Sequence, residues 1–598
     1  MADFVRTTAP RLPAAAGGLR GNVHRDPALR LLIVTALLPA TGAFPARAAE
    51  ATAPVPASQA GTPVERLFQA ADRDRDGRLS PAEVESWPRV SADFHTIDTD
   101  QDGFISRQEL GAALFRWWQQ QGAAKSAPNT QAAGRAGVGG SGARSETRRS
   151  GAANREAAAP ATRERSATLD QHSPQFRGPR GDGVAHGANL PNTWSATSNI
   201  MWSCPIPGKG WSSPIVWGDR IFVTSAAGAG PVEPPPAKLG SVAEHVRGVT
   251  ATDVHRYLLH CVDWRSGKLL WSRVAHEGVP PGPIHPKGSH ASETPVTDGE
   301  RVYAYFGGVG LYCYDLDGRA LWSRQWGSFK MDWNWGTSAS PVLHGDLLFV
   351  LNDNQEASFL AALDKRTGKD VWRVARAEKS NWSSPFVWEQ AGGAEIVTAG
   401  SGRVRSYDLG GKVLWELRGM SNVTVPTPFA AEGLLYLASG NTGSPNKPVY
   451  AIRPGARGDI SLPAGATSNA HIAWCQRKAA PYVTSPLVYD DILYVLLDGG
   501  FLAAYDARTG AEIYDKQRFP GGRAAFTASP WAYDGKIFCL AETGETYVVA
   551  AGREFRVLHI NRLGETALAT PAVARDSVIL RTLTQLHRIA GVAEVMSP

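Results

Sequence analysis

A series of eight Ser-Pro or Thr-Pro pairs, each opening an apolar segment, runs through residues 171–598 of this 598-residue chain. Successive pairs lie 81, 46, 44, 43, 58, 44 and 41 residues apart. A period of about 40–45 residues is typical of propeller blades with four strands each. Because proline cannot donate a hydrogen bond, we expect each strand that follows it to be the innermost of its blade, with one edge unpaired. The prolines are Pro214, Pro295, Pro341, Pro385, Pro428, Pro486, Pro530 and Pro571.

A turn motif follows the proline by about 22 residues in the compact repeats, as in LAALDKRTGKDVW and LYCYDLDGRALW. The Asp starts a tight turn and the Gly takes a positive φ. The strand after the turn carries an aromatic residue in constant phase, and we expect this residue to pack between blades. These residues are Trp271, Trp322, Trp372, Trp415 and Tyr514.

These motifs resemble those of the pyrroloquinoline-quinone-like repeat propellers, whose repeat reads A-x-D-x-x-T-G-x-x-x-W. The resemblance covers residues 171–598 and implies an all-β fold, a β-propeller with eight blades. The chain is also similar to the BamB-like propellers of the outer-membrane β-barrel assembly machinery. That resemblance implies a scaffold that binds partners through loops and needs no catalytic residues.

The last repeat, TPAVARDSVILRTLTQLHRIAG, ends without an outer strand that carries the phased tryptophan. The segment NIMWSCPI, with Trp202, has the character of that strand but precedes the first proline of the series. We therefore predict that it supplies the fourth strand of the last blade, which removes the open edges of the ring.

Two twelve-residue segments in an expected domain at 60–118 match the EF-hand calcium loop, DRDRDGRLSPAE and DTDQDGFISRQE. Each has carboxylates at positions 1, 3, 5 and 12, and Gly at position 6 for the sharp turn. Position 7 offers a backbone carbonyl. The flanking sequences VERLFQAA and SADFHTI predict entering helices, and PAEVESW and RQELGAALFRWW predict exiting ones. The predicted Ca²⁺ ligands are Asp72, Asp74, Asp76, Arg78 (carbonyl) and Glu83 in one loop, and Asp98, Asp100, Asp102, Phe104 (carbonyl) and Glu109 in the other.

The N-terminal 48 residues have the features of a signal peptide. Arginines precede an apolar run over 31–44, and Ala46-Arg47-Ala48 follows it as a cleavage site. We expect export to the periplasm or cell envelope, or secretion. Residues 119–170 contain almost no large apolar side chain, which predicts a disordered linker. No Cys stands directly after the apolar run, so we expect no lipid anchor. No later segment has transmembrane length, so we expect no membrane-spanning helix.

The charge distribution argues against a nucleic-acid partner. The net charge is +6, but residues 171–598 carry 41 basic side chains against 38 acidic ones, and no basic stripe is visible. Five cysteines, all after residue 200, occupy slots that hold small residues in other repeats. We interpret them as buried thiols rather than as a disulfide framework.

The sequence bears on three classes of function: a quinone-dependent enzyme, a binding module and an enzyme of another kind. Quinone-dependent alcohol dehydrogenases of this fold carry a vicinal cysteine disulfide over the cofactor, whereas this chain has no adjacent cysteines. This difference argues against bound pyrroloquinoline quinone. A binding module for an envelope protein or glycan is favoured, and an enzyme with an active site at the channel mouth is the alternative. No G-x-S-x-G, H-E-x-x-H or P-loop motif occurs, and His285 and His290 are the best acid-base or metal candidates.

Residues just before each Ser/Thr-Pro pair are expected to meet at one mouth of the channel. Two residues before the proline, Glu293 is the only charged residue among the eight repeats. A carboxylate among aromatic side chains at a concave centre predicts a ligand site. The alternative is that the aromatic residues plug the channel and Glu293 pairs with a cation such as Lys287. The candidate ligand-binding residues are Trp211, Glu293, Trp333, Trp335 and Trp382.

Overall fold

The computed structural model describes residues 68, 71–74, 76–85, 87–98, 102–106, 109–110, 171–186, 189–236, 247–441, 443–522 and 524–591. The chain forms two compact units, residues 1–146 and 147–598. The predicted leader and linker lie outside the described residues, as does Asp100. No helix among the described residues is long and apolar enough to cross a membrane.

The first unit pairs the two predicted calcium loops. Leu79 and Ile105 form an antiparallel bridge whose two N···O distances are 2.9 and 2.8 Å. The described helices are α3 (Pro88–Ala92) and α4 (Phe94–Ile97), which lie in the entering segment of the second loop. The expected exiting helix PAEVESW is wrong, because its described residues form turns. Pro88 explains this result, since a proline disfavours helical geometry in the residue before it.

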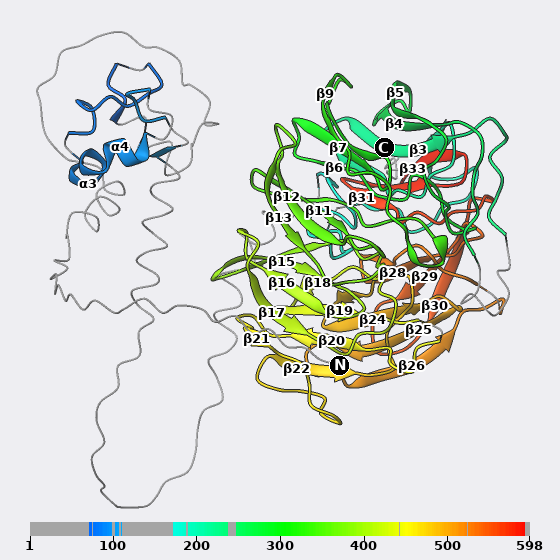
Figure 1. Cartoon of the computed structure of the whole chain (residues 1–598). Helices are drawn as coiled ribbons and strands as arrows, with labels where there is room; N and C mark the ends of the chain where they lie inside the picture. Colours follow the sequence, from blue (N-terminus) through cyan, green and yellow to red (C-terminus); the bar gives the residue numbers. More distant parts are fainter. Residues whose placement is uncertain are drawn as a thin grey trace, which may run out of the picture. The chain divides into compact units, whose positions relative to one another are not determined.

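The second unit consists of eight antiparallel sheets, each the main part of one blade (Figure 1). This arrangement confirms the eight-bladed all-β fold. Blade 1 contains β2 (Ile215–Trp217), β3 (Arg220–Ala227), β4 (His255–Asp263) and β5 (Leu269–Gly278). Blade 2 contains β6 (Val296–Thr297), β7 (Arg301–Phe306), β8 (Gly310–Asp315) and β9 (Ala320–Arg324). Blade 3 contains β10 (Val342–His344), β11 (Leu347–Asn352), β12 (Phe359–Asp364) and β13 (Asp370–Ala375).

The remaining blades repeat this order with two variations, a fifth strand in blade 4 and a shared strand in blade 8. Blade 4 contains β14 (Phe386–Gln390), β15 (Gly393–Thr398), β16 (Val404–Tyr407), β17 (Val413–Leu417) and β21 (Gly458–Asp459). Blade 5 contains β18 (Phe429–Ala431), β19 (Leu434–Ala438), β20 (Val449–Ile452) and β22 (Ile472–Gln476). Blade 6 contains β23 (Leu487–Tyr489), β24 (Ile492–Leu497), β25 (Phe501–Asp506) and β26 (Glu512–Arg518). Blade 7 contains β27 (Trp531–Tyr533), β28 (Lys536–Leu540), β29 (Glu545–Ala550) and β30 (Val557–Arg562). Blade 8 contains β31 (Ala572–Ala574), β32 (Ser577–Arg581), β33 (Gln585–Ala590) and β1 (Ile200–Pro205).

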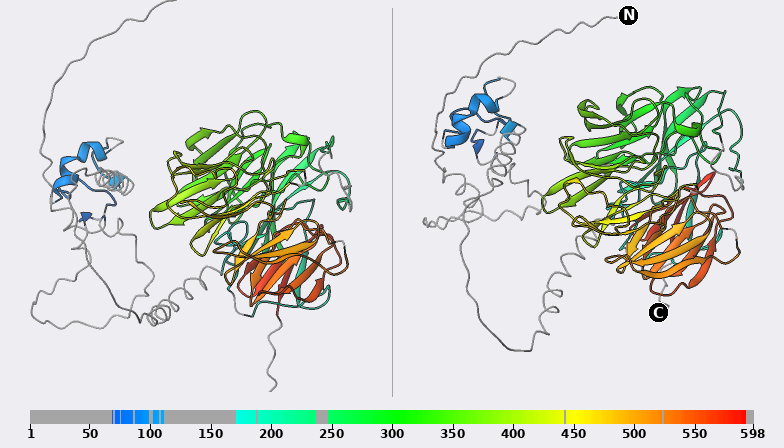
Figure 2. Two further views of the ribbon diagram at one scale, coloured as in Figure 1. Left: turned by 90° about the horizontal axis from the view of Figure 1, so that it is seen from below. Right: turned by 60° about the horizontal axis from the view of Figure 1, so that its bottom comes forward.

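The ring closes as predicted from the sequence. Strand β1 pairs antiparallel with β33, with Cys204 opposite Leu586. The apolar core between blades 8 and 1 then joins β1, β32 and β33 to β2, β3 and β4. Figure 2 shows the first and last blades, coloured cyan-green and red, side by side. An N-terminal strand therefore completes the C-terminal blade and leaves no gap in the ring.

The Ser or Thr of each repeat lies at the start of an innermost strand and links neighbouring blades. In six of the eight steps around the ring, its backbone N–H donates to the hydroxyl of the equivalent residue in the next blade, at 2.9–3.0 Å. These hydroxyls satisfy N–H groups that have no ladder partner on the inner edge. The residues of this hydroxyl ring are Ser213, Thr294, Ser340, Ser384, Thr427, Ser485, Ser529 and Thr570.

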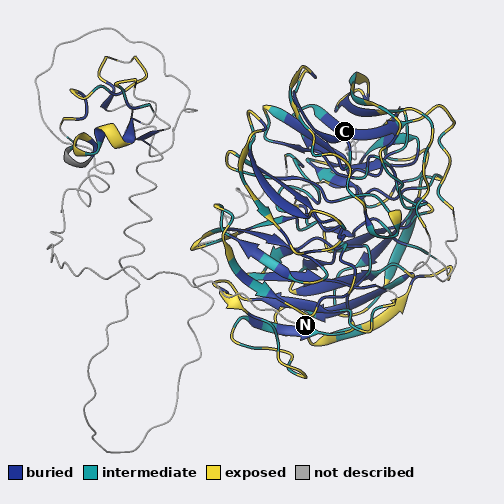
Figure 3. Ribbon diagram, in the orientation of Figure 1, coloured by how far each residue is buried: buried dark blue, intermediate teal, exposed yellow. Residues whose placement is uncertain are grey.

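The phased tryptophans dock between blades, as expected. The indole of Trp322 in blade 2 lies against Gly368 in the turn of blade 3, and its Nε1 donates to the Lys365 carbonyl at 3.2 Å. Trp271 and Trp372 make the same contact with the next blade. These three tryptophans are partly buried, whereas Trp415 is fully buried and its Nε1 donates to Glu395 of its own blade. Figure 3 shows the consequence for burial, with inner strands buried and outer strands such as β26 exposed.

Residues 173–185, which we call the crossing segment, contact the innermost strands of several blades. Ser173 bridges to Val216 in β2, and Val184 bridges to Ala532 in β27. Between these two points, the buried guanidinium of Arg177 donates to the Pro486 carbonyl at 2.6 Å and stacks on a ring in β18. The segment therefore contacts the inner strands of blades on different sides of the ring.

Candidate functional site

The propeller contains a central chamber of about 770 Å³. All eight residues of the hydroxyl ring line it, and Phe176 of the crossing segment contributes to its wall. Because the inner strands begin at the hydroxyl ring, residues of the loops before the prolines, such as Trp211, Trp335 and Trp382, also line the chamber. The chamber is therefore built by the same repeat positions that build the fold.

Aromatic side chains form much of the chamber wall. The rings of Trp335 and Trp382 are 5.7 Å apart, and the Trp382 Nε1 donates to the Gly336 carbonyl at 2.7 Å. Trp211 is fixed similarly, since its Nε1 donates to the Lys287 carbonyl at 2.8 Å. These hydrogen bonds are made at the edges of the indoles, so they fix the rings without covering their faces. The aromatic lining residues are Phe176, Trp211, Trp335, Trp382, Tyr482, Phe501 and Phe526.

The backbone beside this wall is strained. Trp333 and Asn334 follow one another with φ values of 50° and 60°. Asn tolerates this left-handed conformation, but a bulky Trp does so at a cost. Hydrogen bonds from the Gly248 N–H to the Trp333 carbonyl, at 2.9 Å, and from the His285 N–H to the Trp335 carbonyl, at 3.0 Å, hold the turn in place.

Lysines outnumber carboxylates around the chamber. Lys287 pairs with Glu542 at 2.6 Å, and both side chains are largely buried. Asp498 accepts hydrogen bonds from the backbone N–H groups of Tyr482 and Val483, while burial raises its pKa above the ordinary value. The other lining lysines are Lys447, Lys478 and Lys516. The chamber therefore combines aromatic walls with an excess of positive charge.

A second cavity, of about 310 Å³, lies beside the chamber and is called the side pocket here. Ser289 and Thr337 line both spaces. Glu293 lines the side pocket and is 2% exposed. Its carboxylate accepts a hydrogen bond from the Thr337 hydroxyl at 2.5 Å. Burial raises the Glu293 pKa to about 7, against the smaller opposing effect of these hydrogen bonds.

The structure thus separates the predicted ligand-binding residues. Trp211, Trp335 and Trp382 line the chamber, whereas Glu293 lines only the side pocket. Trp333 lines neither cavity and packs against Trp335, with ring centroids 4.6 Å apart. The alternative of a plugged channel with a Glu293–Lys287 pair is wrong, because the chamber is hollow and Lys287 pairs with Glu542.

The two histidines singled out in the sequence lie in different cavities. His285 lines the chamber and packs edge-on against Trp335, and His290 lines the side pocket near Tyr257. Burial lowers the pKa of each to about 4, so both are neutral at pH 7. The only cluster of potential metal ligands found among the described residues is in the first calcium loop.

That loop fits Ca²⁺. One ligand oxygen from each of Asp72, Asp74 and Asp76 can be chosen so that all three lie within 4.8 Å of one another. The Asp72 Oδ1 atom is buried without a hydrogen-bond partner, as expected of an oxygen that faces an ion. Glu83 is oriented by the Ser80 N–H and hydroxyl, at 2.9 and 2.8 Å, and these bonds lower its pKa to about 2. Carboxylate oxygens of this number and type suit a hard cation.

The second loop repeats this geometry at its described positions. The Asp98 Oδ1 atom is likewise buried without a partner, and the Gly103 N–H donates to its Oδ2 at 3.0 Å. Glu109 accepts from the Ser106 N–H at 2.8 Å. Across the two loops, the Arg78 guanidinium pairs with Asp102 at 3.2 Å and lies over the Phe104 ring. The side chains at position 7 thus interact with each other and leave their carbonyls available.

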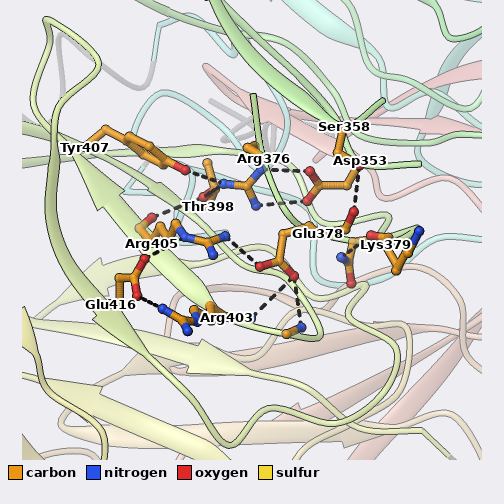
Figure 4. Close-up of polar contacts among 12 residues, drawn as sticks. Asp353, Ser358, Arg376, Glu378, Lys379, Thr398, Arg403, Arg405, Tyr407 and Glu416 are labelled. Atoms are coloured by element: carbon orange, nitrogen blue, oxygen red, sulfur yellow. Dashed lines mark hydrogen bonds and ion pairs between the residues drawn. The ribbon is translucent and has the colours of Figure 1, made fainter. Parts of the chain in front are cut away.

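A buried charge network joins blades 3 and 4 and lines neither of the two cavities (Figure 4). Arg376 forms a bidentate pair with Asp353 at 2.7 and 2.9 Å, and both side chains are 0% exposed. The same guanidinium donates to the Thr398 and Tyr407 hydroxyls of blade 4, at 2.6 and 2.8 Å. Sequence inspection missed this network, because its members lie at the ends of strands in two different repeats.

The geometry of the five cysteines agrees with the expected buried thiols. They lie on five different strands, each buried and free. Burial raises the pKa of Cys475 to about 11 and that of Cys261 to about 12, so neither thiol is a reactive thiolate. No two of these cysteines are adjacent in the sequence, so the chain has no vicinal cysteine pair.

Comparisons with known proteins agree with this architecture. A family model described as outer membrane protein assembly factor BamB matches residues 233–358 and 356–592, and one described as EF hand matches residues 64–86 and 92–115. BamB from Moraxella catarrhalis is 12% identical, with a TM-score of 0.45 over 67% of this chain and 99% of that one. The quinohemoprotein alcohol dehydrogenase from Comamonas testosteroni is 11% identical, with a TM-score of 0.36 over 73% and 83%. No curated protein matches the chain.

Proposed function

Because this chain belongs to the family described as outer membrane protein assembly factor BamB, we propose that it is a binding and scaffold module of the cell envelope. The observation that supports this function most is the chamber, with its aromatic walls and its excess of lysines over carboxylates. Aromatic faces and cationic groups around a concave site suit an acidic partner, either a protein segment or an envelope glycan. No catalytic group is needed for this role.

Two further parts of the proposal concern the N-terminal residues. We propose that residues 1–48 direct export and are removed, and that residues 119–170 link the EF-hand pair at 60–118 to the propeller at 171–598. Sequencing the mature N-terminus tests the export proposal, with Ala49 as the expected first residue. An intact residue 1 in the envelope fraction would contradict it.

A charge-reversal experiment tests the chamber. Lys478→Glu combined with Lys516→Glu changes the charge at the chamber, whereas Lys268→Glu with Lys412→Glu makes the same net change in exposed turns of the outer strands. Each immobilised protein is exposed to an envelope extract, and captured material is quantified by mass spectrometry. We expect the first pair to lose the ligands that the wild type and the control pair retain. Equal capture by all three proteins would reject the chamber as the binding site.

An enzymatic function at the channel mouth is the second candidate, and Glu293 is the observation that favours it. A buried carboxyl with a pKa of about 7 in a cavity suits general acid-base catalysis near neutral pH. Turnover of candidate glycan substrates by the wild type, with loss in Glu293→Gln, would support this candidate. Turnover that persists in Glu293→Gln would reject Glu293 as its catalytic group.

A further inference from the structure

The side pocket contains a buried carboxyl without a cationic partner among the described residues. No described lysine, arginine or histidine lies within ion-pair distance of Glu293, and Lys287 is committed to Glu542. A buried carboxylate is costly unless a charge or several hydrogen bonds compensate it. Among the described side chains, only the Thr337 hydroxyl donates to it, with further stabilisation from the backbone N–H groups of Ser292 and Glu293. The Glu293 carboxylate therefore lacks a compensating positive charge among the described residues.

A second polar group in the same pocket also lacks a partner. Tyr257 is 1% exposed, lines the side pocket, and its hydroxyl has no hydrogen-bond partner. Burial raises the Tyr257 pKa, and the negative charge of the nearby Glu293 carboxylate raises it further. Buried hydroxyls in native proteins are rarely left unpaired, so an orphaned one in a cavity points to a missing ligand.

The oxygens of the pocket are packed around a glycine. A side-chain carbon at Gly307 would lie 1.7 Å from the Thr337 hydroxyl oxygen and 2.9 Å from the Glu293 Oε1 atom. Any other residue at this position would displace the Thr337–Glu293 pair. Phe306 and Phe329 line the same cavity and give it an aromatic wall. The pocket thus combines a carboxylate, two hydroxyls and aromatic faces in about 310 Å³.

We propose that the side pocket binds a primary ammonium ligand with a short apolar substituent. An ammonium group has three donors, which match the oxygens of Glu293, Thr337 and Tyr257. It supplies the missing positive charge, and the aromatic side chains stabilise a cation while accommodating the apolar substituent. This site is separate from the chamber, so the proposal does not depend on the proposed scaffold function.

Calorimetry on the full-length protein at pH 8 tests the proposal with n-butylamine hydrochloride as the probe and 1-butanol as its neutral counterpart. We expect butylamine to bind and butanol to bind at least about tenfold more weakly, because butanol lacks the charge. Glu293→Gln should weaken butylamine binding by at least about tenfold, and Tyr257→Phe by roughly threefold to tenfold. Glu300→Gln, an exposed change in the same blade, is the matched control and should bind as the wild type does.

The pH dependence of binding gives a second measurement. Because the Glu293 pKa is about 7, lowering the pH from 8 to 5.5 should weaken butylamine binding roughly thirtyfold in the wild type. The other titratable groups around the pocket are Tyr257 and Tyr305, whose pKa values burial raises, and His290, which is neutral over this range. Lys330 and Glu356 lie at its exposed rim. Glu293→Gln should remove this dependence.

Several results would overturn the proposal. Absence of heat at millimolar butylamine, equal binding of butanol, or unchanged affinity in Glu293→Gln would each reject an ammonium site. Trp335→Ala, which alters the chamber, should leave butylamine binding intact. A protein that binds butylamine but captures no envelope partner would thus separate this proposal from the scaffold function.

Discussion

The glycine of each turn motif serves two purposes, as Gly368 illustrates. Its φ is +69°, and a side-chain carbon there would lie 2.5 Å from the Trp322 indole of the preceding blade. We expect Gly368→Ala to reduce the free energy of unfolding by about 2–4 kcal/mol, because backbone strain and a clash add. Gly345→Ala is the control, since its φ is +57° but nothing lies within 4 Å. Urea unfolding that shows equal losses in both variants would contradict the clash.

Glu293 should also affect stability, in a manner that depends on pH. Its pKa is about 7 in the folded protein and ordinarily 4.5, so the folded state binds its proton more tightly. This contribution to stability is full below pH 4.5 and is lost as the pH rises through 7. At pH 8, Glu293→Gln should therefore have a free energy of unfolding up to roughly 3 kcal/mol greater than that of the wild type, and a higher melting temperature. The difference should vanish near pH 4.5. Thermal melts at the two pH values measure this; a constant difference would argue against the raised pKa.

The predictability of site residues follows from their place in the repeat. Trp211, Trp335 and Trp382 stand three to six residues before the proline of their repeats, so the repeat alone indicates that they lie at one chamber. Tyr257 and Thr337 cannot be found this way, because each belongs to a single blade. Glu293 stands out in the sequence as the one charged residue at its repeat position. The sequence does not show that its side chain lines the side pocket, where it accepts a hydrogen bond from Thr337.

At the level of strands, the charge network between blades 3 and 4 should contribute substantially to stability. Asp353→Ala leaves the guanidinium of Arg376 buried without its carboxylate. We expect a loss of about 3–5 kcal/mol in the free energy of unfolding. Asp459→Ala breaks an exposed pair with Arg418, whose side chains are 47% and 59% exposed, and should cost less than about 1 kcal/mol. Similar losses for the two variants in denaturant unfolding would show that the network is not coupled through burial.

The calcium loops can be tested by removing one bidentate ligand. Titration of full-length protein with CaCl₂ in a calorimeter should show two sites, and Glu83→Gln should remove one of them, because position 12 completes the coordination shell. Glu85→Gln is the matched control, since this exposed residue lies outside the loop. Affinity of about 10⁻⁴–10⁻³ M is expected for loops of this type outside the cell. Unchanged stoichiometry in Glu83→Gln would reject the assignment.

Elements with a strong repeat were predictable from sequence, and those shaped by local exceptions were not. The innermost strands follow the prolines, because an unpaired inner edge is where proline is tolerated. The exiting helix predicted over PAEVESW is not formed by its described residues, which make turns before Pro88. Strand β21, which pairs parallel with β17, comes from an insertion in blade 5 and has no counterpart in the other repeats.

For the whole molecule, two segments before the first repeat hold the ring of blades together. The crossing segment contacts inner strands of several blades, and β1 completes blade 8. Both precede the first repeat, so neither is visible as part of the period. The pairing of β1 with β33 could still be predicted, because the last repeat lacks an outer strand and a propeller with an open edge exposes unpaired backbone groups.

Three truncations distinguish these contributions. Removal of residues 1–170 leaves every described strand of the propeller and should leave its melting temperature unchanged. Removal of residues 1–190 deletes the crossing segment but keeps β1, so the ring should close with a lower melting temperature. Removal of residues 1–206 also deletes β1, which exposes β33 and the apolar core shared by blades 8 and 1. We expect aggregation or loss of cooperative unfolding only in this last protein, by size-exclusion chromatography and thermal melts. A soluble, cooperative protein without residues 1–206 would show that the shared strand is not what closes the ring.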